Sequence, residues 1–86
     1  MARTKKEQQL LLRVGGTIRY HRRQQGLSQD TFARKAEINR SYFAAIERGE
    51  RNVAVLNLIK IAKALGVEVS ELLAGKRDGE IGIDLK

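Results

Sequence analysis

The sequence predicts an all-α fold, a compact domain of five short helices. Its 86 residues are 42% hydrophobic, which is enough for one small core but not for a second domain. Apolar residues recur at spacings of three and four along most of the chain, the period of helices with one buried face. Glycines and helix-capping polar residues interrupt this pattern several times, and proline is absent. Together these observations favour packed helices over a sheet.

The first helix is expected over residues 8–25. Val14 and Ile18 are spaced for its buried face. Gly15 and Gly16 weaken it, because two interior glycines cost about 2 kcal/mol relative to alanine. Either the helix begins near these glycines, or another backbone packs closely against them.

Residues 26–51 have the pattern of two short helices joined by a tight turn. Gly26 can end the first helix in the left-handed conformation, and Ser28 can cap the next helix through its hydroxyl oxygen. Phe32 and Ala36 then lie on one face of that second helix. A third helix is therefore expected soon after it.

Asn39 is the expected N-cap of this third helix, which ends at Gly49. Phe43 and Ile46 lie three residues apart on its buried side. The side chains left facing outward are Arg40, Ser41, Ala44, Ala45 and Arg48. Two helices in this arrangement are the sequence signature of a DNA-binding helix-turn-helix.

The fourth helix is expected over residues 55–65 and the fifth over residues 70–74. The residues expected to point inward from the fourth helix are Val55, Leu58, Ile59, Ile61, Ala62 and Leu65. The tail, residues 76–86, alternates apolar with polar or small residues, which is the period of a strand. A lone strand lacks a ladder partner, so we expect the tail either to be disordered or to pair with a second copy of the chain.

The net charge of +7 is concentrated at the start of the chain. Residues 1–23 carry seven basic side chains against one acidic, whereas residues 52–86 are balanced. Such a positive field attracts a polyanion, although many small domains are equally basic for solubility alone. Residues 1–7 are expected to form a basic N-terminal arm that is disordered in the free protein and contacts phosphates weakly when DNA is bound.

Several function classes are not expected. Without cysteine, disulfides and thiolate metal sites are unavailable, and the cytoplasm is the expected compartment. The longest apolar stretch, residues 10–12, is far shorter than the roughly 20 residues of a membrane span. His21, the only histidine, is expected on the outer side of the first helix without partners for metal binding or catalysis. We therefore predict no metal, no cofactor, no small-molecule ligand, no membrane contact and no enzymatic activity.

The chain resembles the Cro/Xre family of helix-turn-helix transcriptional regulators over about residues 14–74. The family pattern matches at Ile18, Arg19, Arg22, residues 26–29, Phe32, Ala33, residues 46–49 and residues 58–67. Within the family, residues 39–42 followed by residues 46–48 look most like restriction-modification controller proteins. The resemblance implies a lambda-repressor-like five-helix domain over residues 8–75.

The resemblance also implies roles for individual residues. Arg40, Ser41 and Ala45 fall where family members touch base edges in the major groove. Arginine can bind guanine through two hydrogen bonds, serine can form one, and the alanine methyl can contact a thymine methyl. The residues expected at phosphates, which position the protein without reading sequence, are Gln29, Asn39, Tyr42, Arg48 and Arg51. For Tyr42 the alternative is that it packs over the second helix and never reaches DNA.

Arg22 and Glu47 match a family ion pair that joins the first helix to the end of the third, a structural role. Two departures weaken helix capping: Thr31 replaces the usual acidic residue of a capping box, and Ala54 replaces a capping serine or threonine. Leu56 occupies a position that is usually polar. The candidate dimer residues are Leu56, Leu72 and Leu73.

The expected function is that of a sequence-specific transcriptional regulator, either a controller protein or a small repressor. It would bind double-stranded DNA with two-fold symmetry as a homodimer. The alternative is an antitoxin-type module that binds a toxin and regulates its own gene. Non-specific nucleoid binding is a third reading, with steep salt dependence but no sequence preference.

Overall fold

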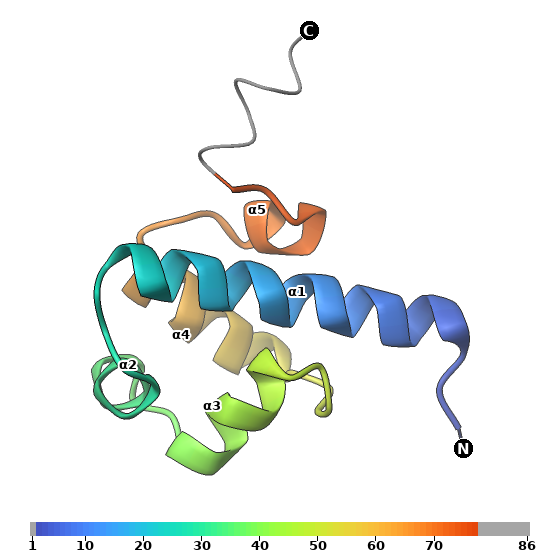
Figure 1. Cartoon of the computed structure of the whole chain (residues 1–86), viewed down its shortest axis with the longest axis horizontal. Helices are drawn as coiled ribbons and strands as arrows, with labels where there is room; N and C mark the ends of the chain where they lie inside the picture. Colours follow the sequence, from blue (N-terminus) through green and yellow to red (C-terminus); the bar gives the residue numbers. More distant parts are fainter. Residues whose placement is uncertain (1, 78–86) are drawn as a thin grey trace, which may run out of the picture.

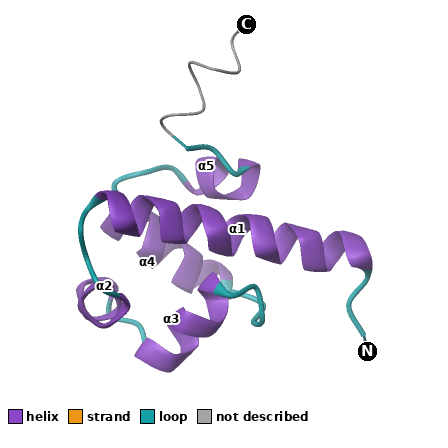
Figure 2. Cartoon of the chain, in the orientation of Figure 1, coloured by secondary structure: helices purple, strands orange, loops and turns teal. Residues whose placement is uncertain are grey.

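The structure, a computed structural model, describes residues 2–77, and within them it contains five α-helices and no strand (Figure 2). The helices are α1 (Lys5–Gln24), α2 (Gln29–Ala36), α3 (Arg40–Glu47), α4 (Val55–Leu65) and α5 (Val69–Ala74). The predicted all-α class with five helices is confirmed. Residues 78–86, which carry most of the predicted tail, lie outside the described residues.

Helix α1 begins three residues before the expected start. Thr4 Oγ1 accepts a hydrogen bond of 3.0 Å from the Glu7 backbone N–H, and Glu7 Oε1 accepts one of 2.9 Å from the Thr4 N–H. This capping box satisfies two backbone donors that would otherwise lack partners. The expectation of a disordered arm over residues 1–7 is therefore wrong for residues 5–7, which belong to α1. Arg3 is also engaged, since its Nη2 donates to the Glu50 carbonyl at 3.0 Å.

The paired glycines lie inside α1, where the helix crosses the end of α3. A Cβ added at Gly15 would lie 2.3 Å from the Ile46 carbonyl oxygen and 2.7 Å from that of Glu47. Close approach of another backbone is therefore the correct explanation for Gly15, whereas Gly16 faces only the end of the Arg77 side chain. Glycine at position 15 lowers the helix propensity of α1, but a side chain there would prevent the close crossing of α1 and α3.

The turn between α2 and α3 forms as its residues predict. Ser28 Oγ accepts from the Thr31 N–H at 3.0 Å, and Asn39 Oδ1 accepts from the Tyr42 N–H at 2.9 Å, so both expected caps are confirmed. Helix α2 ends at Glu37, which adopts the left-handed conformation with φ of 61°. The chain can then turn within two residues and begin α3 at Arg40.

All five helices meet in one core. In Figure 1, α1 crosses the molecule with α4 behind it, α5 on one side, and α2 and α3 on the other. The rings of Phe32 in α2 and Phe43 in α3 pack with centroids 5.1 Å apart. The other buried members of the core are Val14, Ile18, Ala33, Ala36, Ile46, Leu58, Ile61, Ala62, Leu65 and Leu72.

Three expectations about burial in α4 and α5 are wrong. Val55 and Ile59, expected inside, are 71% and 39% exposed, because α1, α2 and α5 contact α4 along only one side. Leu72, expected at a dimer surface, is fully buried in the core, whereas Leu73 is 43% exposed. Val55, Ile59 and Leu56, the last 74% exposed, form an apolar strip on α4 that we call the α4 patch.

Candidate nucleic-acid interface

The first turn of α3 presents polar side chains to solvent. Arg40 and Ser41 are exposed, directly after the Asn39 cap. The Arg40 side chain is 63% exposed, and its Nε lies 3.9 Å from Asp30 Oδ1 of α2. This loose pairing leaves most of the guanidinium accessible. Both side chains can therefore approach base edges if α3 enters a major groove.

Ala45 does not face outward as expected. It is 9% exposed and belongs to the buried side of α3, together with Phe43, Ile46 and Glu47. Ala44 is the half-exposed alanine of this helix. Because α3 is only eight residues long and packs against both α1 and α2, its solvent-facing arc is narrower than the sequence pattern indicates.

The buried carboxylate of Glu47 joins three helices. Arg22 of α1 donates to it twice, from Nε to Oε2 at 2.7 Å and from Nη2 to Oε1 at 3.0 Å. The structure thus pairs the two residues expected to form the structural ion pair. Arg19 Nε lies 3.7 Å from Oε1, and Arg22 Nη1 also donates to the Leu27 carbonyl at 2.8 Å. This network fixes α1 against the end of α3 and the start of α2.

Gln29, the first residue of α2, is part of the same network. Its Nε2 donates a hydrogen bond of 2.9 Å to Glu47 Oε1. A carboxamide nitrogen carries two N–H donors, so one remains after this bond. The amide lies at the N-terminus of α2, where the helix dipole favours an anion.

Tyr42 makes contacts within the protein, and the phosphate contact expected of it stays a prediction. Its hydroxyl donates toward the Asn52 carbonyl at 3.4 Å and accepts from the Ala54 N–H at 3.2 Å. Ala54 offers no side-chain cap to α4, as expected, and the tyrosine hydroxyl supplies an acceptor at that helix start. Tyr42 therefore ties α3 to the N-terminus of α4.

The two remaining candidate arginines follow α3. Arg48 Nε lies 3.1 Å from Glu50 Oε1, and its side chain is half exposed. The Arg51 guanidinium lies 5.3 Å from the centre of the Tyr42 ring, a cation–π distance. Asn39, whose Oδ1 accepts the cap hydrogen bond, is exposed directly before α3, and both arginines are exposed after it. Arg19, to which the sequence assigned no role, approaches the Glu47 carboxylate as well. The signal for it in the sequence is its position one helical turn before Arg22 on α1.

His21 is buried, whereas the outer side of α1 was expected. Its Nε2 lies 3.0 Å from the Lys76 carbonyl, and its ring meets Tyr20 edge-on at 5.3 Å. The histidine therefore holds the segment after α5 against α1. Within residues 2–77 no group of three or more histidine, cysteine, aspartate or glutamate side chains is arranged to hold a metal ion.

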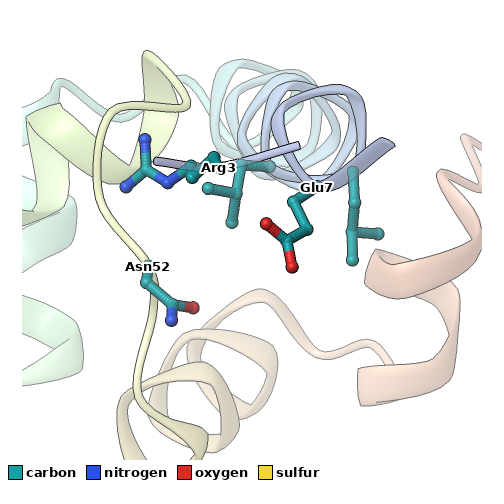
Figure 3. Close-up of a pocket in the computed structure, with 5 residues that line it drawn as sticks. Arg3, Glu7 and Asn52 are labelled. Atoms are coloured by element: carbon teal, nitrogen blue, oxygen red, sulfur yellow. The ribbon is translucent and has the colours of Figure 1, made fainter. Parts of the chain in front are cut away.

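A pocket of about 280 Å³ lies between the start of α1 and the loop after α3 (Figure 3). Arg3, Glu7 and Asn52 supply its polar groups. The Glu7 carboxylate is used by the capping box, and Arg3 donates to Gln8 and Glu50. These contacts are structural.

None of the helices in the described part of the chain is long and apolar enough to cross a membrane.

Proteins similar to this chain contain the same helix-turn-helix. A family model described as helix-turn-helix matches residues 18–72. The chain is 39% identical to the control protein C.MunI of Mycoplasma over 64 residues, which cover 73% of this chain and 86% of the relative.

Solved structures of controller proteins match as well. The restriction-modification controller protein C.AhdI from Aeromonas hydrophila is 44% identical with a TM-score of 0.70, over 72% of this chain and 94% of that one. The controller protein C.Esp1396I, solved as a tetramer in complex with its natural 35 base-pair operator, is 34% identical with a TM-score of 0.68, over 76% of this chain and 90% of the other.

Proposed function

We propose, because this chain belongs to the helix-turn-helix family of DNA-binding transcriptional regulators, that it binds a two-fold symmetric operator as a homodimer and regulates transcription there. Family membership confirms the resemblance that the sequence indicated. The family acts by binding DNA and has no enzymatic activity. The relatives described above are controller proteins, which gives the antitoxin alternative no support, and we do not propose it.

The observation that carries the proposal is the exposed first turn of α3 next to the amide of Gln29. When α3 enters a major groove, Arg40 reads a guanine through two hydrogen bonds and Ser41 contacts the neighbouring base. Ala44, the half-exposed alanine, takes the thymine-methyl contact first expected of Ala45. Gln29 donates its second amide N–H to a phosphate at the edge of the same groove.

Three further side chains position the domain on the DNA by binding its phosphate backbone. Asn39, Arg48 and Arg51 are exposed on the segments directly before and after α3. Their contacts fix the register of α3 without reading sequence, and they make affinity fall with rising salt. Tyr42 orients Arg51, because its hydroxyl bonds to the neighbouring Asn52 carbonyl and its ring lies against the Arg51 guanidinium.

The α4 patch and Leu73 form the proposed dimer surface. Val55, Leu56 and Ile59 are neighbours on one side of α4, and α5 packs against that helix. Pairing two such surfaces removes apolar area from water at about 25 cal/mol per Å². Dimerisation would place two copies of α3 in successive major grooves, with half-sites about 34 Å apart. Regulation would then follow the concentration of the protein in the cytoplasm, where we place it.

Selection of bound duplexes from a random pool, at about 150 mM salt, tests this function. We expect an enriched palindromic motif whose two halves are about one helical turn apart. A pool without enrichment, bound only at low salt, would contradict sequence-specific regulation. Such a result would instead favour non-specific nucleoid binding.

A further inference from the structure

A cationic hollow lies on the outer face of α1, away from the core. It has a volume of about 330 Å³. Its lining residues are Gly16, Arg19, Tyr20, Arg23, Gln24 and Arg77. Among the described residues, this lining contains three guanidinium groups and no carboxylate. We call it the α1 hollow.

Contacts around the α1 hollow give it a defined shape. Gly16 forms part of the floor, since a Cβ added there would lie only 3.4 Å from Arg77 Nη2. The Arg77 guanidinium lies 5.6 Å from the centre of the Tyr20 ring, a cation–π distance. Arg19 is drawn toward the buried Glu47 carboxylate at 3.7 Å. The cation–π contact therefore orients Arg77 before any ligand arrives, whereas Arg19 Nε approaches Glu47 without forming a hydrogen bond among the described residues.

Arg23 contributes an exposed charge to the α1 hollow. Across the described part of the chain, no acidic side chain forms an ion pair with it. An arginine among other arginines raises the local positive potential. The hollow therefore favours an anion with several acceptor oxygens, such as a phosphodiester.

The α1 hollow is continuous with the start of α2. Arg19 Nε and Gln29 Nε2 both approach the same atom, Glu47 Oε1, at 3.7 Å and 2.9 Å. In Figure 1 the end of α1 lies above the loop that leads into α2. Successive phosphates of one DNA strand rise by about 3.4 Å along the helix axis. Gln29 and Arg19, a lining residue of the α1 hollow, are therefore neighbours, so a strand whose phosphate bonds to Gln29 passes close to one edge of the hollow.

We propose that the α1 hollow binds backbone phosphate of the DNA that flanks each operator half-site, beyond the bases that α3 reads. The proposal rests on the DNA-binding function proposed above and extends its footprint outward along α1. Because the contact is to phosphate, it adds affinity for longer duplexes without adding sequence preference.

Duplex length provides the test. Binding of the full-length protein is compared on two duplexes that carry the selected motif. One duplex ends at the outer edge of each half-site, and the other extends about six base pairs further on each side. We expect the wild type to bind the longer duplex roughly fivefold more tightly or better, with a salt dependence steeper by about one unit per hollow.

Arg23→Ala is expected to abolish the advantage of the longer duplex and to leave binding to the shorter duplex unchanged. Lys63→Ala is the matched control: it removes the same charge from an exposed position on α4 and should keep the length advantage. The inference is overturned if the wild type gains nothing from the flanks, or if Arg23→Ala gains as much as the wild type. Either result leaves binding to the short motif intact, whereas failure of the proposed function would leave no selected motif to bind.

Discussion

Gln29 Nε2 donates a 2.9 Å hydrogen bond to Oε1 of Glu47, a carboxylate that is fully buried at the end of α3. The same carboxylate receives both hydrogen bonds from Arg22. The charge network that holds α1 to α3 therefore also orients the amide proposed to meet a DNA phosphate. The Glu47 carboxylate therefore serves both the stability of the fold and the proposed contact with the DNA backbone.

Removing the Glu47 carboxylate should lower stability. In Glu47→Ala the Arg22 guanidinium stays buried without its counter-charge, a situation that costs about 3 to 5 kcal/mol. We expect a lower melting temperature in thermal denaturation, and weaker DNA binding as a consequence of the destabilised fold. Glu50→Ala, which removes the exposed partner of Arg48, is the control and should melt close to the wild type. Unchanged melting of Glu47→Ala would refute the structural role of the pair.

The glycine pair in α1 offers a second test. Gly15→Ala places a methyl 2.3 Å from the Ile46 carbonyl oxygen, so α1 and α3 must move apart, at a cost of about 1 to 3 kcal/mol. Gly16→Ala meets only the end of the Arg77 side chain at 3.4 Å and should be neutral or stabilising by up to about 1 kcal/mol. Urea denaturation of the two variants measures the difference. Equal stabilities would contradict the close helix crossing.

The α4 patch should control the oligomeric state. Leu56→Lys places a charge in the middle of this exposed apolar strip, so we expect a folded monomer in sedimentation equilibrium where the wild type is a dimer. Leu12→Lys adds the same charge at an exposed leucine of α1 and should leave the dimer intact. Retention of the dimer by Leu56→Lys, or its loss in the Leu12 variant, would move the dimer surface away from α4.

Much of this fold follows from local sequence signals. Ser28 and Asn39 cap α2 and α3 as expected, and α4 has the predicted bounds because Gly66 stops it in the left-handed conformation. Helical periodicity predicts that Phe32 and Phe43 lie on the buried faces of α2 and α3, and the two rings do meet in the core.

The wrong expectations concern residues whose burial or partners depend on contacts between helices. Periodicity marks an apolar residue as buried, but it cannot tell how many neighbours a helix has, so it predicts a buried Val55 that is in fact 71% exposed. Nor does it show that α5 packs against α1, which buries Leu72. Ala45 faces the core because α3 packs between two helices. The link from Glu47 to Gln29 joins residues 18 positions apart, and neither side chain is unusual in the sequence. Such contacts depend on how the helices cross.

Arg40 is proposed to read bases, whereas Arg48 is proposed to contact only the DNA backbone. The most direct measurement compares the Arg40→Ala and Arg48→Ala variants on the selected operator, on operators changed at single base pairs and on random duplex. For Arg40→Ala we expect a loss of about 1 to 3 kcal/mol on the operator, with relaxed preference at one base pair of each half-site and little change on random DNA.

For Arg48→Ala we expect weaker binding to every duplex alike, with a salt slope shallower by about one unit for each phosphate that the arginine no longer neutralises. Both variants should retain the melting behaviour of the wild type, since both side chains are exposed. Equal losses on operator and random DNA for the two variants would contradict the claim that α3 reads sequence through Arg40.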